Sequence, residues 1–426
     1  KIKEQLLRNG EKVYDALIKM TDNTVVVNSD KPEYLWVDFT KQAFQSEQSN
    51  IQLVITKQAE TKAFDISLES VSCQKLQEPM DLTVWAYSKN SPIWNNNNKQ
   101  QIADLLIAEG VNNITIHPNY LPNIKSAERW TTKQKRALAD EINLYKGDNL
   151  KYLLISGWSP GRNYYVDDNG YITNASKNDF KIWLSELERF IDEYNFSHEQ
   201  VLLYLVDEPS GQKLNALKQF SELLLNESSQ LRLYANPTNA RKGAATLNDL
   251  NYLLPAVSLW QPLWGYIKDN DFQFFKQLKE PWHIYDLPVS PAKAAGPDDF
   301  YRGLAWRAWS VGASGTGTWS FDDTARSSAF DDFDGKRSDW SMVYESDNGA
   351  VHPSRRWFAM LRGIEDLRLS TYWHDQQSLK DNVYKGKPIN KNDLFAAAVQ
   401  GCSLSQSEED IIKEPNPPKI DRVVIQ

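Results

Sequence analysis

Short apolar runs alternate with longer amphipathic segments along the chain from residue 82 onward. The runs lie at residues 82–88, 113–118, 152–157, 202–208, 231–237, 256–262, 282–287 and 315–321. A run that is apolar at nearly every position is typical of a parallel strand with helices covering both faces. Eight such strands alternating with helices predict an α/β fold, a (β/α)8 TIM-type barrel in which strand order follows chain order.

The segments between the runs carry apolar residues at spacings of three and four, which predicts helices with one buried face. In one segment these residues are Phe180, Trp183, Leu184, Leu187, Phe190, Ile191 and Tyr194, and in the next Leu214, Leu217, Phe220 and Leu224. Gly110 stands where a helix C-cap is expected. The eighth helix is predicted to contain residues 357–367, and a further helical patch lies at 394–399.

The pattern differs before residue 80. Residues 1–20 carry Leu6, Leu7, Val13, Leu17 and Ile18 at mixed helical spacings, which predicts a short helix. From Thr24 onward, short β-branched or alternating runs separated by polar turns predict a small β-rich, sandwich-like domain. We therefore expect three parts: the β-rich domain at 1–80, the barrel at 81–370 and a C-terminal extension at 371–426.

The fourth run, LLYLVDEPS at residues 202–210, ends in two adjacent carboxylates and a proline. Pro209 cannot donate to a strand ladder, so the strand should end there and deliver Asp207 and Glu208 to the rim. Two neighbouring carboxyls repel each other and push one pKa upward, which suits an enzyme that needs a proton donor beside a charged partner. The alternative is an acidic start to the helix expected from Lys213.

The ends of the predicted strands bring acids and aromatic rings to one rim. The residues there are His117, Trp158, Asp207, Glu208, Asn236, Trp260, Trp264, Tyr285, Asp286, Trp319, Asp322 and Asp323. Carboxylates beside Trp and Tyr are typical of a glycosidase cleft, where rings of the sugar stack on aromatic faces. For each aromatic residue the alternative is packing inside the barrel, and for His117 it is a structural hydrogen bond.

Several other chemistries lack their motifs. The chain has no Ser nucleophile elbow, no Walker loop, no G-x-G-x-x-G and no His-Glu-x-x-His, and we expect no cofactor. Cys73 and Cys402 have no metal-type spacing, and DDFDG at 331–335 places Gly335 where a calcium loop needs an oxygen ligand. We therefore expect no metal site.

Composition narrows the class of partner. A net charge of -8 argues against nucleic acid or an anionic membrane surface, since both require clustered Lys and Arg. No apolar run approaches the roughly 20 residues that a membrane helix requires. An oligosaccharide or polysaccharide is the expected partner. The chain begins at Lys1 without an apolar signal segment, as a processed chain would, and we expect an extracytoplasmic location, periplasmic or secreted.

Two segments carry a resemblance to a known family. YDLPVSPAKAAGPDDFYRGLAWRAWSVGASGTGTWSF, at 285–321, and PSRRWFAMLRGIEDLRL, at 353–369, resemble the C-terminal half of glycoside hydrolase family 123. The likeness extends over residues 85–369 and is tightest from the seventh strand onward. It implies a β-sandwich followed by a (β/α)8 barrel and action on β-linked N-acetylgalactosamine.

The resemblance also assigns roles to the acid pair. In that family an Asp-Glu pair closes the fourth strand, and the 2-acetamido group of the substrate is the nucleophile. Carried over, Asp207 orients the amide and Glu208 is the general acid and base. The substrate-binding residues we expect are His117, Trp158, Trp260, Tyr285, Asp286 and Trp319.

Two other interpretations stay open. In an ordinary retaining glycosidase, Glu208 would be the acid/base and Asp286 the covalent nucleophile. DEP at 207–209 resembles the NEP of that large barrel clan, but the clan normally has Asn where this chain has Asp207. The third interpretation is a non-catalytic polysaccharide-binding protein, although both acids are present.

Overall fold

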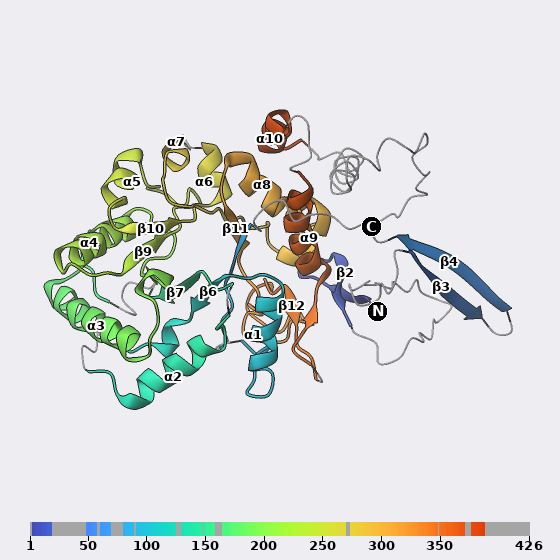
Figure 1. The fold of residues 1–426 in the computed structure, drawn as a ribbon, viewed down its shortest axis with the longest axis horizontal. Coiled ribbons are helices and arrows are strands. Elements are labelled where there is room, and N and C mark those ends of the chain that lie inside the picture. The colour runs from blue at the N-terminus through green and yellow to red at the C-terminus, as the bar shows by residue number, and fades with distance from the viewer. Residues whose placement is uncertain are drawn as a thin grey trace, which may run out of the picture.

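The computed structural model describes residues 2–18, 48–57, 60–69, 80–88, 91–124, 129–147, 149–157, 164–269, 273–347, 349–370 and 376–387. Its centre is a curled sheet of seven parallel strands in the order β10-β9-β8-β7-β6-β5-β11 (Figure 1). They are β5 (Asp81–Val84), β6 (Asn113–Ile116), β7 (Tyr152–Ser156), β8 (Val201–Tyr204), β9 (Arg232–Ala235), β10 (Val257–Trp260) and β11 (Gly315–Thr318). Seven of the eight predicted strands are thus confirmed, each shorter than its apolar run.

The predicted seventh strand, at 282–287, is an extended segment that does not form a continuous ladder with its neighbours. The backbone N–H of His283 donates to Trp260 at 2.8 Å, and that of Ile284 donates to Gly315 at 3.0 Å. The segment therefore joins β10 to β11 and curls the sheet round, but its pairing is limited to isolated bridges. One reason is Pro262, two residues beyond the end of β10, which has no N–H to donate to the neighbouring segment.

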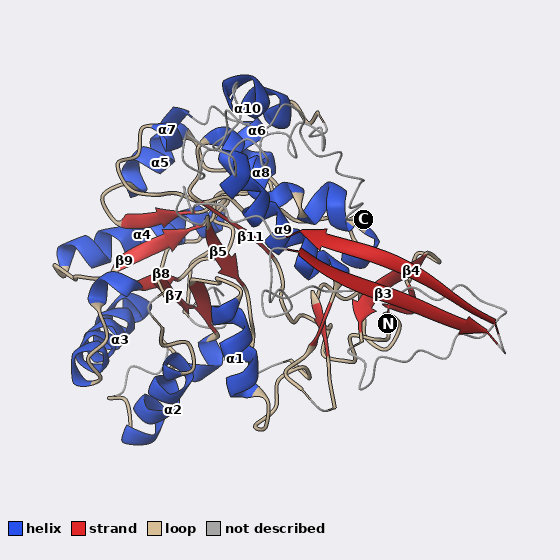
Figure 2. Ribbon diagram, turned by 45° about the vertical axis from the view of Figure 1, so that its right-hand side comes forward, coloured by secondary structure: helices blue, strands red, loops and turns tan. Residues whose placement is uncertain are grey.

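Helices surround the sheet on its outer face (Figure 2). They are α1 (Lys99–Ala108), α2 (Thr132–Asn143), α3 (Asn174–Glu193), α4 (Gln212–Asn226), α5 (Leu247–Leu253), α6 (Trp264–Asp269), α7 (Gln273–Lys276), α8 (Gly303–Val311), α9 (Arg355–Ser370) and α10 (Gln376–Tyr384). Shorter helical turns are η2 (Pro118–Tyr120), η3 (His198–Gln200), η4 (Ala292–Ala294) and the π-turn η5 (Pro297–Tyr301).

The predicted helix faces are confirmed. In α3 the residues at three-and-four spacing from Phe180 to Ile191 are buried, and in α4 those from Leu214 to Leu224 are buried. Helix α9 contains the predicted residues 357–367. Gly110 follows α1 with φ +82°, the left-handed conformation that glycine adopts without steric cost at a helix end.

The helix predicted over residues 1–20 is wrong. Residues 2–17 form an antiparallel hairpin of β1 (Ile2–Leu6) and β2 (Lys12–Leu17), which turns at Gly10 with φ +84°. The hairpin is fixed by distant segments: Asp15 is buried and accepts hydrogen bonds from Arg356 of α9 at 2.8 and 3.0 Å. These contacts span more than 300 residues, so the local spacing of apolar residues could not reveal them.

The remaining strands lie outside the parallel sheet. β3 (Gln48–Lys57) and β4 (Glu60–Glu69) form a regular antiparallel hairpin that projects away from the sheet (Figure 2), and β12 (Val343–Tyr344) pairs with β13 (His352–Pro353). Residues 19–47 and 70–79 lie outside the described residues, so the sandwich and the 1–80 boundary stay predictions. Cys73, Cys402 and the helical patch at 394–399 also lie outside the described residues.

Candidate active site

A cavity of about 1220 Å³ opens at the carboxyl ends of the parallel strands. Its floor and walls include Trp85, Tyr87, His117, Tyr204, Asp207, Glu208, Asn236, Arg241, Tyr285, Trp319 and Asp322, with residues 323–327 and 334–337 on one side. These side chains follow β5, β6, β8, β9 and β11 and the 282–286 segment. The cavity thus lies where a barrel of this kind carries its chemistry.

The Asp207 carboxylate is held by neighbouring strands. The Tyr204 hydroxyl, at the end of β8, donates to Asp207 Oδ1 at 2.5 Å. The Asn236 side-chain amide, just beyond β9, donates to the same oxygen at 3.1 Å and to the Tyr204 hydroxyl at 2.9 Å. Burial, together with the charge of Asp207, raises the pKa of Tyr204 well above its ordinary value, so this phenol remains a proton donor.

Glu208 lies beside Asp207 with its carboxylate towards the cavity. Its backbone N–H donates to Asn236 Oδ1 at 3.0 Å, so one amide side chain contacts both acids. The Tyr285 hydroxyl donates to Glu208 Oε1 at 3.0 Å, and Arg241 Nε lies 3.4 Å from Oε2. Glu208 has φ +49°, which is uncommon for a residue with a side chain and is found at positions that function requires.

Aromatic rings form the other surfaces of the cavity. The Trp85 and Tyr285 rings pack at 5.8 Å, and Trp319 Nε1 donates to the Tyr87 hydroxyl at 3.0 Å. His117 packs edge-on against Tyr87, and its Nδ1 accepts the Asn119 N–H at 3.1 Å. His117 therefore has a structural hydrogen bond and also lines the cavity.

Not every predicted site residue lies in this cavity. Trp260 is buried against Phe274 and Phe275, and Trp264 packs on Tyr384. Neither tryptophan is among the lining residues. Successive side chains of a strand point to opposite faces of the sheet, so the last residue of a run faces either the cavity or the helices. The residues predicted from the ends of the runs therefore include some of each orientation. Trp158 lies outside the described residues.

The Asp286 side chain does not line the cavity, whereas that of its neighbour Tyr285 does. Its carboxylate lies 3.1 Å from Arg307 Nε and accepts the Leu287 N–H at 2.9 Å, and it is not among the cavity-lining residues. Burial raises the pKa of Asp286, and the charge of Arg307 opposes that shift. Tyr285 and Asp286 are neighbours in an extended segment, so only one of the two faces the cavity.

Asp322 and Asp323 follow β11 and have structural partners. Asp322 is fully buried and accepts hydrogen bonds from the backbone N–H of Tyr87 at 2.9 Å and from Trp94 Nε1 at 2.5 Å. Its burial raises its pKa to about 7. Asp323 Oδ2 lies 2.5 Å from Arg337 Nη2. Both acids therefore brace the wall of the cavity.

The predicted strand ends did not include the cavity-lining residues Trp85, Tyr87, Tyr204, Arg241 and 324–327. Trp85 and Tyr87 belong to the first apolar run. They could have been predicted in the same way as the other rim residues, from their position at the carboxyl end of a strand. Tyr204 lies inside an apolar strand, where a tyrosine is equally typical of core. Arg241 and the loop residues 324–327 have no periodic signal.

No metal centre is indicated by the side chains. Across the part of the chain that the structure describes, no three or more His, Cys, Asp or Glu residues are grouped so that they could hold an ion. Among the same residues, no helix combines the length and apolar character that crossing a bilayer requires.

Comparisons with known proteins identify the fold. No family model and no curated protein matches the chain. Among solved structures, a family 123 glycoside hydrolase from Clostridium perfringens, studied for glycolipid glycan hydrolysis, is similar with a TM-score of 0.56 and 11% identity over 84% of this chain and 74% of that one. An endo-β-1,4-mannanase from Thermotoga petrophila has a TM-score of 0.44 and 11% identity, covering 74% and 79%. A homocysteine methyltransferase from Escherichia coli has a TM-score of 0.38 and 11% identity, covering 57% and 92%. At such identities the first likeness establishes the fold, and the chemistry must be argued from the site.

Proposed function

We propose that this chain is a retaining glycoside hydrolase that cleaves β-linked N-acetylhexosamine by substrate-assisted catalysis. Two adjacent carboxylates face one cavity, and Trp85, Tyr285 and Trp319 supply rings on which a sugar can stack. The fold is similar to that of a family 123 glycoside hydrolase, and barrels of this kind carry their chemistry at the carboxyl ends of the strands. The assignment to N-acetylgalactosamine rests on the sequence resemblance.

The fixed orientation of Asp207 is the observation that carries the proposal. Tyr204 and Asn236 both donate to Oδ1, so the carboxylate has a defined direction beside Glu208. Oδ2 has no hydrogen-bond partner within the described residues and is available to an N–H of the substrate. A carboxylate held in this way can orient an acetamido group and stabilise the positive charge that it acquires.

The reaction we propose has two steps. In the first, the acetamido oxygen bonds to the anomeric carbon while the bond to the leaving-group oxygen breaks, and that oxygen takes a proton from Glu208. In the second, water adds to the anomeric carbon and gives a proton to Glu208, and the acetamido oxygen departs. Asp207 accepts the amide N–H throughout, and this hydrogen bond strengthens as charge develops.

The two-carboxylate alternative requires a second acid at the anomeric carbon. Asp286, its natural candidate, is paired with Arg307 and lies outside the cavity lining, whereas Tyr285 contacts Glu208. This placement favours the substrate as the source of the nucleophile. The non-catalytic alternative predicts binding of glycan without turnover.

A panel of aryl glycosides tests the proposal. We expect hydrolysis of 2-acetamido-2-deoxy-β-glycosides, negligible activity on plain β-galactosides and β-glucosides, and strong inhibition by a thiazoline that mimics the cyclised intermediate. Mass spectrometry after incubation with 2-fluoro glycosides should show no adduct. A stable glycosyl-enzyme at Asp286, without inhibition by the thiazoline, would contradict the mechanism and support the two-carboxylate alternative. Absence of turnover on every glycoside would support the non-catalytic one.

A further inference from the structure

Three cations lie together on one wall of the cavity, which we call the basic wall, although Asp323 and Asp334 line it too and the chain has a net charge of -8. Arg326, Lys336 and Arg337 all line it, on the loop that follows β11. The first two are exposed, and within the described residues neither has a hydrogen-bond or ion-pair partner. Two unpaired cations on a cavity wall indicate a surface suited to an anionic group.

The acids of the same loop have hydrogen-bond or ion-pair partners within the loop itself. Asp334 accepts the Ser328 N–H at 2.8 Å, and Asp323 is paired with Arg337. Asp332 is buried and accepts hydrogen bonds from the Ser338 hydroxyl at 3.0 Å and the Asp339 N–H at 2.9 Å. None of these carboxylates pairs with Arg326 or Lys336.

The backbone brings the two cations to neighbouring positions. A Cβ at Gly335 would lie only 2.9 Å from Ala325 Cβ, so the segments that carry Arg326 and Lys336 approach closely where a larger residue would not fit. Ala325 and Arg326 both have positive φ, at 52° and 79°. Two successive non-glycine residues in this region cost free energy, and such strain is retained mainly at functional sites.

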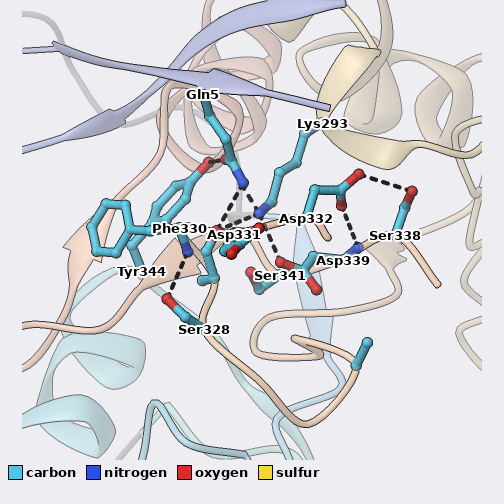
Figure 3. Close-up of polar contacts among 12 residues, drawn as sticks. Gln5, Lys293, Ser328, Phe330, Asp331, Asp332, Ser338, Asp339, Ser341 and Tyr344 are labelled. Carbon is cyan, nitrogen blue, oxygen red and sulfur yellow. Dashed lines mark hydrogen bonds and ion pairs between the residues drawn. The ribbon is translucent and has the colours of Figure 1, made fainter. Parts of the chain in front are cut away.

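A buried network holds the loop in place (Figure 3). The Lys293 ammonium is fully enclosed and contacts the Ala329 carbonyl at 2.5 Å, Asp339 Oδ2 at 3.1 Å and Gln5 Oε1 at 3.4 Å. It also lies 4.9 Å from the centre of the Tyr344 ring. The loop backbone that carries the cations is therefore fixed to η4 and to β1.

The basic wall adjoins the sugar-stacking surface. The Arg337 guanidinium lies 5.3 Å from the centre of the Trp319 ring, and Trp319 contacts Tyr87 in the cavity. A sugar stacked on Trp319 would carry its substituents towards Arg337 and its neighbours. We propose that Arg326, Lys336 and Arg337 form a subsite for a sulfate ester or carboxylate on the glycan, so that the substrate is an anionic glycan.

This inference rests on the proposed glycosidase activity, and the test separates the two. We compare kcat/KM for a 6-sulfated aryl 2-acetamido-2-deoxy-β-galactoside with kcat/KM for its unsulfated form, as a ratio. An N-acetylgalactosaminide of a uronic acid serves as a second anionic substrate, which carries a carboxylate in place of the sulfate. Because hydrogen bonds to a charged group are strong, we expect a ratio of about ten or more for at least one anionic substrate. Raising the salt concentration should lower that ratio.

Variants localise the effect. The double variant Arg326→Gln/Lys336→Gln should bring the ratio close to one, whereas Lys133→Gln, which removes an exposed cation of α2 away from the cavity, should leave it unchanged. An equal kcat/KM for sulfated and unsulfated substrates in the unmodified protein, or an unchanged ratio in the double variant, would overturn the subsite.

A binding measurement covers the case without turnover. If the protein hydrolyses neither substrate, the proposed function fails, and the subsite is judged by calorimetric titration with 6-sulfated N-acetylgalactosamine and with the unsulfated sugar. Tighter binding of the sulfated sugar that the double variant abolishes would support the subsite independently of catalysis. Equal binding of the two sugars would overturn it.

Discussion

Two acid pairs follow strands of the same sheet and have opposite surroundings. Asp207 and Glu208 come after β8, and Asp322 and Asp323 come after β11. The first pair lies with both carboxylates in the cavity and side-chain hydroxyl and amide groups around them. In the second pair, Asp322 is completely buried, and its partners are a backbone N–H and an indole that belong to the wall.

The difference shows that position at a strand end does not by itself leave an acid available to a ligand. Asp207 lines the cavity and keeps one carboxylate oxygen without a hydrogen-bond partner within the described residues. Asp322 joins the Tyr87 backbone to Trp94 and so holds the first strand end in place. A carboxylate with an available oxygen in a cavity can act on a ligand, whereas one enclosed by its own chain stabilises the structure.

The largest expected effect is on activity. Glu208→Gln and Asp207→Asn should each lower kcat about 10³-fold on a substrate with a poor leaving group, since general acid catalysis and charge stabilisation contribute factors of this size. Asp322→Asn should lower it about tenfold or less, because it preserves the shape of the wall. Equal losses in all three variants would remove the distinction between the pairs.

Leaving-group dependence sharpens the roles within the first pair. Glu208→Gln should lose much less activity on activated aryl glycosides, which depart without a proton, than on alkyl glycosides. Asp207→Asn should slow both alike, because the acetamido group must be oriented in either case. The same dependence in both variants would show that the roles are wrongly divided.

A further prediction concerns pH and stability. Asp322 has a pKa of about 7 in the folded protein, above the 3.8 of an ordinary Asp. Between these values the folded state binds more protons than the unfolded state, so the free energy of unfolding should fall as pH rises from about 4 to 7, by about 4 kcal/mol. Asp322→Asn should remove that contribution, as urea denaturation across this pH range would show. An identical pH dependence in the variant would contradict the assignment.

Another prediction compares two indole donors. Trp94→Phe removes the donor to the Asp322 carboxylate and should lower the free energy of unfolding at pH 8 by about 2 kcal/mol. Trp319→Phe removes a donor to the neutral Tyr87 hydroxyl and should cost about 1 kcal/mol. Chemical denaturation of both variants checks the order, and a larger loss in Trp319→Phe would contradict it.

The last prediction concerns a hydroxyl group in the cavity. Tyr285→Phe removes the hydroxyl that donates to Glu208 and should lower kcat/KM about tenfold with little change in stability. Tyr234→Phe is the matched control, because the Tyr234 hydroxyl donates to Gln261 in the core. It should leave activity unchanged and cost about 1 kcal/mol of stability. Loss of activity in the control alone would argue against the role of Tyr285.

Much of the parallel sheet could be predicted because its signal is local. A strand buried on both faces is apolar at nearly every position, and its covering helix repeats at three and four, so residues 201–235 were placed within a few positions. The N-terminal hairpin could not be predicted in the same way. Its buried residues include Gln5 and Asp15, whose partners Ala329 and Arg356 lie at the other end of the chain.

For the candidate site, the sequence could predict which residues lie at strand ends, but not which of their side chains face the cavity. Asp207, Glu208, Asn236, Tyr285 and Trp319 all line the cavity, whereas the spatial direction of Trp260 and Asp286 depends on strand alternation at the exact point where pairing ends. A one-residue uncertainty in that point reverses the direction of a side chain. The loop cations have no pattern at all, because loops are not constrained by periodicity.

The anchoring of the N-terminal hairpin has a consequence for how the protein is made. Residues 2–17 come before the parallel sheet in the chain, yet Asp15 pairs with Arg356 and Gln5 contacts Ala329. The hairpin therefore cannot complete its burial until almost the whole barrel has left the ribosome, and its long-range contacts should form late in folding. Since Gln5 also belongs to the network that fixes the loop carrying Arg326 and Lys336, the cavity should reach its final shape in the last stage of folding, after β8 is already paired.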